Sequence, residues 1–184
     1  MDGAGWCLFE TALGPCGIAW RADGTILAAQ LPEADSERTR ARMAQRLPGV
    51  DEREPSLAVQ VVMARMQAAL AGHPDGLEDV RLAWDTVTPF HRRVYEITRA
   101  IPPGRTRTYG EIAQALGEPG ASRAVGQALG LNPFAPIVPC HRVLAAGNAG
   151  GGFSADGGVA TKLRMLQAEQ AQPAGAPDLF GFSL

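Results

Sequence analysis

The first 31 residues of the chain alternate short apolar runs with turn signals. Apolar residues fill 6–13, 17–20 and 25–31, and the runs are separated by Gly14-Pro15 and by Ala22-Asp23-Gly24. Short apolar runs between Gly, Pro and Asp residues are typical of antiparallel strands joined by tight turns. We therefore expect a meander from Trp6 to about Leu31.

Two helices are predicted after this meander. The charged segment from Ser36 to Leu47 is stopped by Pro48-Gly49. A second helix begins after the capping residue Ser56 and ends at Gly72, with a stripe of apolar side chains at helical spacing: Val59, Val62, Met63, Met66 and Leu70. Residues 79–85 fit one more strand. The first domain, 1–87, is then a small α+β unit.

The pattern changes to a helical one at Thr88-Pro89. Thr88 is a good N-cap and Pro89 fits the first helical position. Apolar residues then recur three or four positions apart at Phe90, Val94, Ile97 and Ile101. We expect a second domain over 88–171, followed by a flexible tail over 172–184.

Two short helices in the second domain form a predicted helix-turn-helix. Thr108 and Glu111 have the spacing of a capping box, which predicts a helix from Tyr109 to Leu116. Pro119 starts the next helix, which runs to Leu129 and carries Arg123 outward.

Composition and charge exclude some classes of protein. No window of about 18 apolar residues is present, and the N-terminus lacks the pattern of a secretory signal. We expect an intracellular, cytoplasmic protein that does not bind membranes. Residues 1–90 carry a net charge of −5, whereas residues 91–143 carry +4, entirely through arginine. Arginine is suited to phosphate contacts, so the middle segment is a candidate nucleic-acid surface or simply a solvated charged face.

Cys140 is the candidate nucleophile. The apolar run from Pro136 to Pro139 precedes it and should hold it rigidly at the edge of a core. A thiol reacts as the thiolate, which a nearby histidine or cation favours, and His141 and Arg142 follow directly. A buried structural cysteine beside a surface histidine is the ordinary alternative.

Glu169 is a candidate partner for His141. A helix is predicted from about Val159 to Ala171, with Val159, Leu163 and Leu166 as its apolar stripe. Glu169 lies three residues after Leu166, on the same side, and a buried carboxylate there needs a partner. The alternative is a glutamate at the edge of the stripe, exposed to water.

These motifs, in this order, resemble the O6-alkylguanine-DNA alkyltransferase family. The resemblance covers residues 88 to about 170, and is weaker in the first half. It rests on five segments: Thr108 to Ala113, Ser122 to Gly126, Asn132-Pro133, Pro139 to Val143, and the helix that carries Lys162, Leu166 and Glu169.

The resemblance implies both an activity and a set of site residues. Cys140 would accept an alkyl group irreversibly from O6-alkylguanine in double-stranded DNA, with one turnover per molecule, and O4-alkylthymine is a second candidate substrate. His141 would activate Cys140 through a water, and Glu169 would hold His141. The other implied roles are DNA contact by Arg123, Ser122, Ala124 and Arg142, nucleotide rotation and base protonation by Tyr109, turn stabilisation by Asn132, and a guanine pocket formed by Pro139, Val143, Phe153 and Ser154.

The implied fold is α+β: a small ribonuclease-H-like N-terminal domain and a mostly helical, winged-helix-like C-terminal domain with the helix-turn-helix. We expect a monomer without cofactors. Some relatives bind a structural zinc ion in the first domain, and Cys7, Cys16, His73 and His91 are candidate ligands here. They form no short ligand pair, so we predict no metal.

Two other classes of function compete with this one. A non-enzymatic, alkyltransferase-like damage-recognition module would flip alkylguanine without repairing it, but that class lacks the acceptor that Cys140 provides. A cysteine hydrolase would release its product and need no DNA, and Arg123 within a helix-turn-helix disfavours it.

Overall fold

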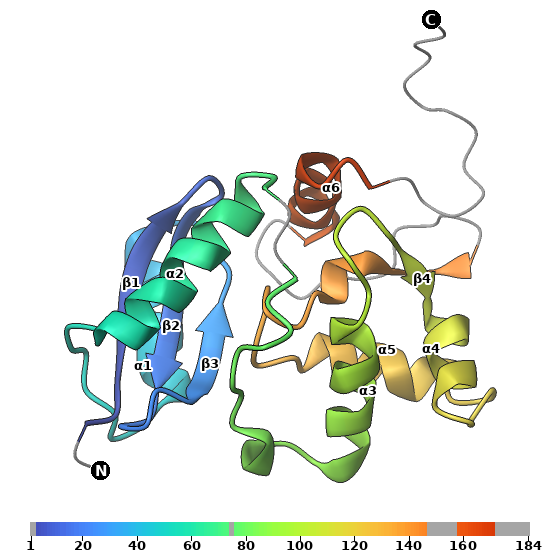
Figure 1. Ribbon diagram of the computed structural model, residues 1–184, viewed down its shortest axis with the longest axis horizontal. Helices are drawn as coiled ribbons and strands as arrows, with labels where there is room; N and C mark the ends of the chain where they lie inside the picture. Colours follow the sequence, from blue (N-terminus) through green and yellow to red (C-terminus); the bar gives the residue numbers. More distant parts are fainter. Residues whose placement is uncertain (1–2, 74–75, 147–157, 172–184) are drawn as a thin grey trace, which may run out of the picture.

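The predicted meander forms a three-stranded antiparallel sheet. In this computed structural model, which describes residues 3–73, 76–146 and 158–171, the strands follow the order β1-β2-β3 (Figure 1). They are β1 (Gly5–Thr11), β2 (Gly14–Trp20) and β3 (Ile26–Gln30). Gly14 and Gly24 adopt φ angles of 120° and 80°, which side chains disfavour. The turns therefore form where the sequence places glycine.

Two helices cover opposite faces of this sheet (Figure 1). They are α1 (Ser36–Arg46), capped by Asp35, and α2 (Leu57–Leu70), capped by Ser56. Successive strand residues point to opposite faces, so each helix meets a different set of side chains. Met43 of α1 packs with Trp6, Ala19 and Ala28, whereas α2 belongs to the cluster that contains Cys7, Ile18 and Ala29.

The strand expected over residues 79–85 is not formed. Leu82 makes a single parallel bridge to Ile26, and the chain then enters a short 3-10 helix, η1 (Trp84–Thr86). The Val80 amide donates to the Leu77 carbonyl at 3.2 Å, so the residues just before this bridge form a turn. Pairing therefore does not extend toward residue 79.

The second half contains the predicted helices. They are α3 (Pro89–Arg99), α4 (Tyr109–Ala115), α5 (Ser122–Gly130) and α6 (Gly158–Ala168). Thr88 caps α3, and both hydrogen bonds of the Thr108–Glu111 capping box are present. α5 begins three residues after Pro119, because residues 118–121 close a turn through the Ala121 amide and the Glu118 carbonyl at 2.8 Å.

A two-stranded parallel ladder links α4 to the segment with the candidate nucleophile. β4 (Arg107–Thr108) pairs with β5 (Val143–Leu144), and the 3-10 helix η2 (Cys140–Arg142) immediately precedes β5. The start of α4 is thereby held close to the end of η2.

The two halves share one core. Buried side chains from the sheet, α2, α3, α5 and α6 belong to a single cluster. The edge of β3 that does not pair with β2 is hydrogen-bonded to the second half of the chain: the Ala29 amide donates to the Pro133 carbonyl at 2.8 Å. Gly72, just after α2, lies so close to α6 that an added Cβ would be 2.6 Å from the Ala168 carbonyl oxygen.

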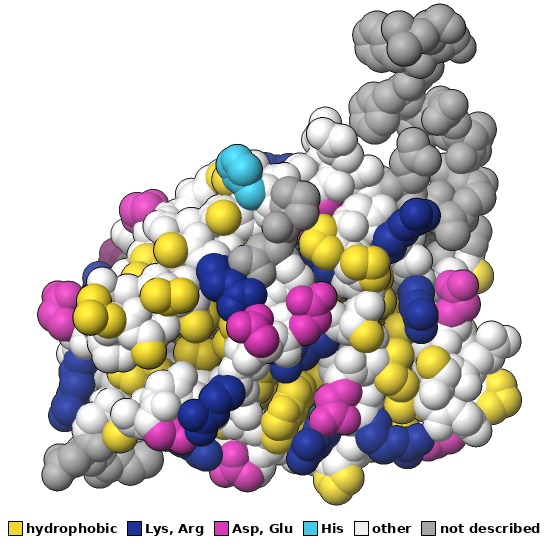
Figure 2. All heavy atoms as spheres, in the orientation of Figure 1, with side chains coloured by type: hydrophobic (Ala, Val, Ile, Leu, Met, Phe, Trp, Pro, Cys, Tyr) yellow, Lys and Arg dark blue, Asp and Glu magenta, His cyan; other side chains and the backbone are white. Residues whose placement is uncertain are grey.

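Charges of both signs are interspersed on the face drawn in Figure 2, and hydrophobic side chains gather over α2. Leu57 and Val61 of α2 are 79% and 59% exposed. The described side chains on this face therefore form no patch of a single charge of the kind that would attract DNA.

Among the helices within residues 3–73, 76–146 and 158–171, none has the length and the apolar composition that a membrane span requires.

Arg99 ties the connection between the halves to α3. Its Nη2 donates to the carbonyl oxygens of Leu77, Glu78 and Val80 at 2.7, 2.8 and 2.9 Å. The guanidinium also lies 5.8 Å from the centre of the Trp84 ring. Because Arg99 is buried, these contacts replace the water that it would otherwise bind.

We therefore expect Arg99→Met to lower the free energy of unfolding by about 3 kcal/mol, because buried carbonyl groups lose a charged donor. Urea unfolding measures this change. Arg92→Met is the matched control, since Arg92 also stacks on Trp84 but is half-exposed and pairs with Glu96. Its loss should stay below about 1 kcal/mol. Equal losses for the two variants would contradict the role of Arg99.

Candidate active site

Cys140 lies at the edge of the shared core, as the apolar run before it predicts. Ile137 and Val138 are fully buried, and Cys140 itself is 8% exposed. The Cys140 amide donates to the Val138 carbonyl at 2.8 Å, and the Arg142 amide donates to the Pro139 carbonyl at 2.9 Å. These bonds fix the backbone on both sides of the thiol.

Asn132 fastens this segment to the end of α5. Its Nδ2 donates to the Val138 carbonyl at 2.9 Å, and its Oδ1 accepts from the Phe134 amide at 3.0 Å. One side chain thus bridges the turn after α5 and the residues before Cys140. This position agrees with the turn-stabilising role that the family resemblance implies.

His141 and Glu169 are brought together, although 28 residues separate them in the sequence. His141 Nε2 lies 2.8 Å from Glu169 Oε1, and both side chains are buried. Since a carboxylate only accepts, Nε2 carries the proton and Nδ1 of the neutral ring has a free lone pair. Among the described residues, no hydrogen-bond partner contacts Nδ1, which is also buried. Nδ1 is therefore the atom that can act as a base.

We expected Arg142 to contact DNA, but its side chain is buried inside the protein. It is 4% exposed, and its Nε and Nη2 donate to Glu169 while Nη1 donates to the Ile101 carbonyl at 2.6 Å. All of its nitrogens are committed inside the protein, so no face of the guanidinium is open to a phosphate. The side chain instead anchors the carboxylate that holds His141.

The charges of this network set the protonation states of its members. Burial alone would raise the pKa of Glu169, but hydrogen bonds from His141 and Arg142 and their charges lower the pKa to about 2. Burial lowers the pKa of His141, although Glu169 opposes this effect. Near neutral pH, Glu169 is ionised and His141 is neutral.

Cys140 is a protonated thiol in this environment. Burial raises the pKa of Cys140, against the opposing effects of the Asn132 side chain, the charge of Lys162 and nearby backbone amides. A thiol held in this state needs a base to take its proton at the moment of reaction. The neutral imidazole of His141 is adjacent in the chain and has that capacity.

Lys162 belongs to the site, although the sequence analysis assigned it no role. It is 1% exposed, its Nζ donates to the Val143 carbonyl at 2.6 Å, and it lies 5.9 Å from the centre of the Tyr109 ring. Its charge is one of those that favour the Cys140 thiolate. The seven-residue spacing from Lys162 to Glu169 places both on one helical face and could have signalled this position.

The buried stripe of α6 also differs from the expected one. Val159 and Leu163 are 41% and 57% exposed, whereas Leu166 is buried as predicted. Met165 and Lys162 complete the buried face. The face of α6 that points into the protein is therefore the one with Lys162, which bonds to the Val143 carbonyl. This orientation also places Glu169 next to His141.

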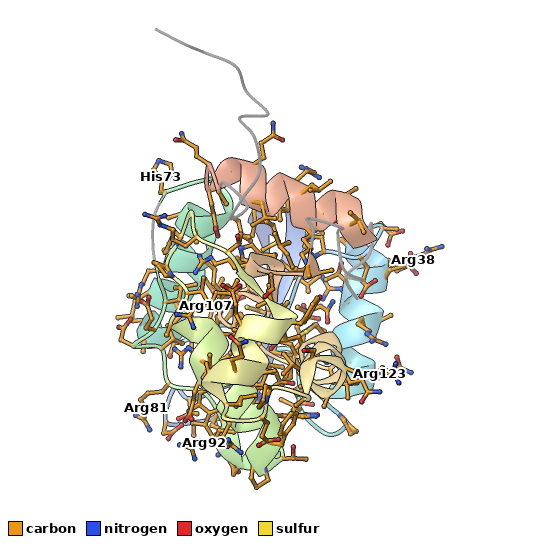
Figure 3. All side chains as sticks on the ribbon, turned by 90° about the vertical axis from the view of Figure 1, so that its right-hand side faces the viewer. Arg38, His73, Arg81, Arg92, Arg107 and Arg123 are labelled. Atoms are coloured by element: carbon orange, nitrogen blue, oxygen red, sulfur yellow. The ribbon has the colours of Figure 1, made fainter. Side chains whose placement is uncertain are left out.

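The remaining candidates lie around this centre. Tyr109, at the start of α4, is half-buried, and burial with the charge of Cys140 raises the pKa of its phenol. Ser122, Arg123 and Ala124 form the first turn of α5, and Figure 3 shows Arg123 pointing away from the molecule. Pro139 and Val143 are buried beside Cys140, whereas Phe153 and Ser154 lie outside the described residues.

The zinc candidates do not gather into a site. Cys7 and Cys16 are buried in the sheet, and burial raises the pKa of Cys7 to about 11 and that of Cys16 to about 12. Within the parts of the chain that the structure describes, no three His, Cys, Asp or Glu side chains are grouped to hold a metal ion.

Comparisons with known sequences agree on one family. A model for the 6-O-methylguanine DNA methyltransferase DNA-binding domain matches residues 89–171. The methylated-DNA–protein-cysteine methyltransferases of Mycobacterium tuberculosis strain H37Rv and Salmonella typhimurium are each 48% identical to the chain, over 85 and 82 residues. These matches cover 46% and 45% of this chain, and 50% and 47% of the relatives. The chain thus aligns with about half the length of the curated relatives that it matches.

Solved structures extend the similarity to most of the chain. The Mycobacterium tuberculosis protein OGT, crystallised in complex with DNA, is 31% identical with a TM-score of 0.73, covering 90% of this chain and 92% of that one. The O6-methylguanine-DNA methyltransferase of Pyrococcus kodakaraensis is 28% identical with a TM-score of 0.67, covering 90% and 98%. The mixed fold of helices and strands that the sequence predicts is thus the fold of these enzymes. The chain belongs to the methylated-DNA–protein-cysteine methyltransferase family.

Proposed function

We propose that this protein repairs alkylated DNA by transferring the alkyl group from O6 of guanine to its own Cys140. The observation that carries the proposal is the buried arrangement of Cys140, His141 and Glu169 in a chain of this family. The proposed partner is double-stranded DNA that contains an alkylated guanine. No cofactor is needed, because the thiol itself is the acceptor.

The transfer is a balanced displacement. His141 takes the proton of the Cys140 thiol through a water molecule, and Glu169 stabilises the imidazolium that forms. The Cys140 sulfur bonds to the alkyl carbon while the bond from that carbon to guanine O6 breaks, and the electron pair stays on the base. The Tyr109 phenol gives its proton to the departing base, and the proton from His141 then restores Tyr109.

The product explains why each molecule reacts once. Attack at an sp3 carbon gives a thioether, which has no carbonyl group for water to attack. A cysteine hydrolase would instead form a thioester that water cleaves. The protein is therefore consumed in stoichiometric amounts, as a suicide enzyme.

The substrate base must leave the DNA stack to meet a buried thiol. Extrusion of a nucleotide costs a few kcal/mol of stacking and pairing. Arg123, exposed at the start of α5, would fill the space that the base leaves, while the rest of α5 docks on the DNA. Ser122 and Ala124 flank it and would contact the backbone.

We also propose the finer assignments of fold and state. Residues 1–87 form a ribonuclease-H-like domain, and residues 88–171 form a winged-helix-like domain that binds DNA and carries the acceptor. The helices on both faces of the β-meander and the β4–β5 ladder beside α4 and α5 support these assignments. We propose a cytoplasmic monomer.

The acceptor residue is tested by intact-protein mass after incubation with a duplex that contains O6-methylguanine. Wild type should gain one methyl group, which peptide mapping places on Cys140, and Cys140→Ala should gain none while it still binds the duplex. Cys7→Ala is the matched control and should react normally, because the pKa of Cys7 is raised to about 11. Tight binding of the duplex by wild type without any mass change would favour the damage-recognition module instead.

Arg123→Ala should slow transfer from duplex DNA on the order of tenfold or more, because base extrusion loses its support. Transfer from the free alkylguanine base should change little. Arg81→Ala is the control, since Figure 3 shows Arg81 and Arg123 at opposite sides of the molecule. Rapid-quench assays on both substrates measure the effect, and equal slowing on duplex and free base would refute the role of Arg123.

Glu169→Gln tests the network through its pH dependence. The pKa of Glu169 falls from 4.5 to about 2 on folding, so its stabilisation is present above pH 4.5 and is lost as the pH falls toward 2. The variant should lose about 3 kcal/mol of unfolding free energy at neutral pH and less near pH 3. Urea unfolding at both pH values measures this, with the half-exposed Glu96→Gln as control. A loss that does not depend on pH would contradict the ionised state of Glu169.

A further inference from the structure

A cavity adjoins Cys140 on the side that faces the first half of the chain. It has a volume of about 280 Å³, and Asn132, Ala135 and Cys140 form its wall on the second half. The opposite wall comes from α1 and the end of β3. At about 30 Å³ for a water-sized group, the cavity has room for roughly nine such groups.

The two walls differ in chemistry. The lining residues near Cys140 are Gly130, Leu131, Asn132 and Ala135, of which only Asn132 is polar. The opposite wall carries the guanidinium groups of Arg42 and Arg46 and the amide of Gln30, with Glu33 as its single carboxylate. The lining therefore has a net positive charge, carried by the wall opposite Cys140.

Among the described residues, Arg46 has no carboxylate within ion-pair distance, and Arg42 has only Glu33. Arg46 donates to the Gln30 side chain at 2.5 Å and to the Pro133 carbonyl at 3.3 Å, and both of these acceptors are neutral. Arg42 lies 4.0 Å from Glu33, at the limit of an ion pair, and Glu33 already accepts from Gln30 at 3.0 Å. Burial and the charge of Arg42 lower the pKa of Arg46, and the charge of Glu33 only partly opposes them, so a further anion placed here would stabilise the charged guanidinium.

We propose that this cavity is a subsite for the distal part of long alkyl groups, and that Arg42 and Arg46 select groups that end in a carboxylate. The inference rests on the proposed transfer to Cys140. The bond formed is still sulfur to carbon and the bond broken is still carbon to guanine O6. The distal carboxylate takes no part in the chemistry but pairs with the guanidinium groups across the cavity.

A DNA phosphate is the other anion that these arginines could meet. The alkyl group is favoured because Cys140 itself lines the cavity. A substituent on the reacting carbon would therefore start beside the subsite. A phosphate would have to enter from the DNA backbone, and its contacts would affect every substrate equally.

The experiment compares three O6 substituents in the same duplex: methyl, pentyl and 4-carboxybutyl. The last two have five carbons each and differ only in the terminal group. Rates of transfer to Cys140 are followed by intact-protein mass at low ionic strength. We expect wild type to accept the carboxybutyl group about tenfold faster than the pentyl group, the factor that one charge-assisted hydrogen bond supplies.

Arg42→Gln should bring this ratio close to one, and Arg46→Gln should lower it as well. Arg42 is the primary variant because it is half-exposed, so its loss should not disturb folding. Arg38→Gln is the matched control from the same helix: Arg38 is 72% exposed, points outward in Figure 3 and should leave the ratio unchanged. As a second test, Ala135→Val narrows the approach to the cavity and should slow both long groups relative to methyl.

Three results would overturn the subsite. Wild type could transfer the pentyl group as fast as the carboxybutyl group. Arg42→Gln could slow all three substrates equally, which would assign Arg42 to the DNA backbone. Methyl transfer could be absent in wild type, and this result alone would contradict the alkyl-transfer function together with its subsite.

Discussion

The carboxylate of Glu169 is the contact on which the rest of the site depends. It accepts from the His141 ring at 2.8 Å, from Arg142 at 2.9 Å and from the Gly104 amide at 3.3 Å. These donors come from the segment with the nucleophile and from the turn after α3, whereas Glu169 follows α6. A buried charge of this kind is tolerated only when its partners satisfy it. The same contacts that stabilise the carboxylate therefore hold three distant segments in register around Cys140.

This constraint explains how a reactive cysteine can be stored safely. Burial keeps Cys140 in the thiol form and His141 neutral, and the hydrogen bond to Glu169 orients the ring so that its Nδ1 lone pair is free. Before substrate binds, the site holds a thiol and a neutral imidazole rather than a preformed thiolate. Reaction of Cys140 with small electrophiles is therefore limited. Lys162 adds a fixed positive charge that favours the thiolate once the proton leaves. In the proposed reaction each molecule reacts once, so an acceptor that stays unreactive until its substrate arrives is an advantage.

Much of this arrangement could be predicted from sequence, for reasons that differ between residues. Capping residues and helical periodicity act locally, so the starts of α3 and α4 and the turns of the meander were predictable. The pairing of His141 with Glu169 was predicted from the position of Glu169 three residues after Leu166, although Val159 and Leu163 of the expected stripe are exposed. Arg142 could not be placed in this way, because its burial depends on the Ile101 carbonyl, 41 residues away. The same limit applies to the segment expected as a strand over 79–85, which makes a single bridge to Ile26, and to the cavity between α1 and Cys140.

The most direct test of this account is the protonation state of the His141 ring, measured by 15N NMR on protein labelled at histidine. The account predicts a neutral imidazole near pH 7, with the proton on Nε2 toward Glu169 and none on Nδ1. Assignment to His141 is secured by the loss of its signals in His141→Gln. An imidazolium at neutral pH, or a neutral ring with the proton on Nδ1, would contradict the role of His141 as the base for Cys140.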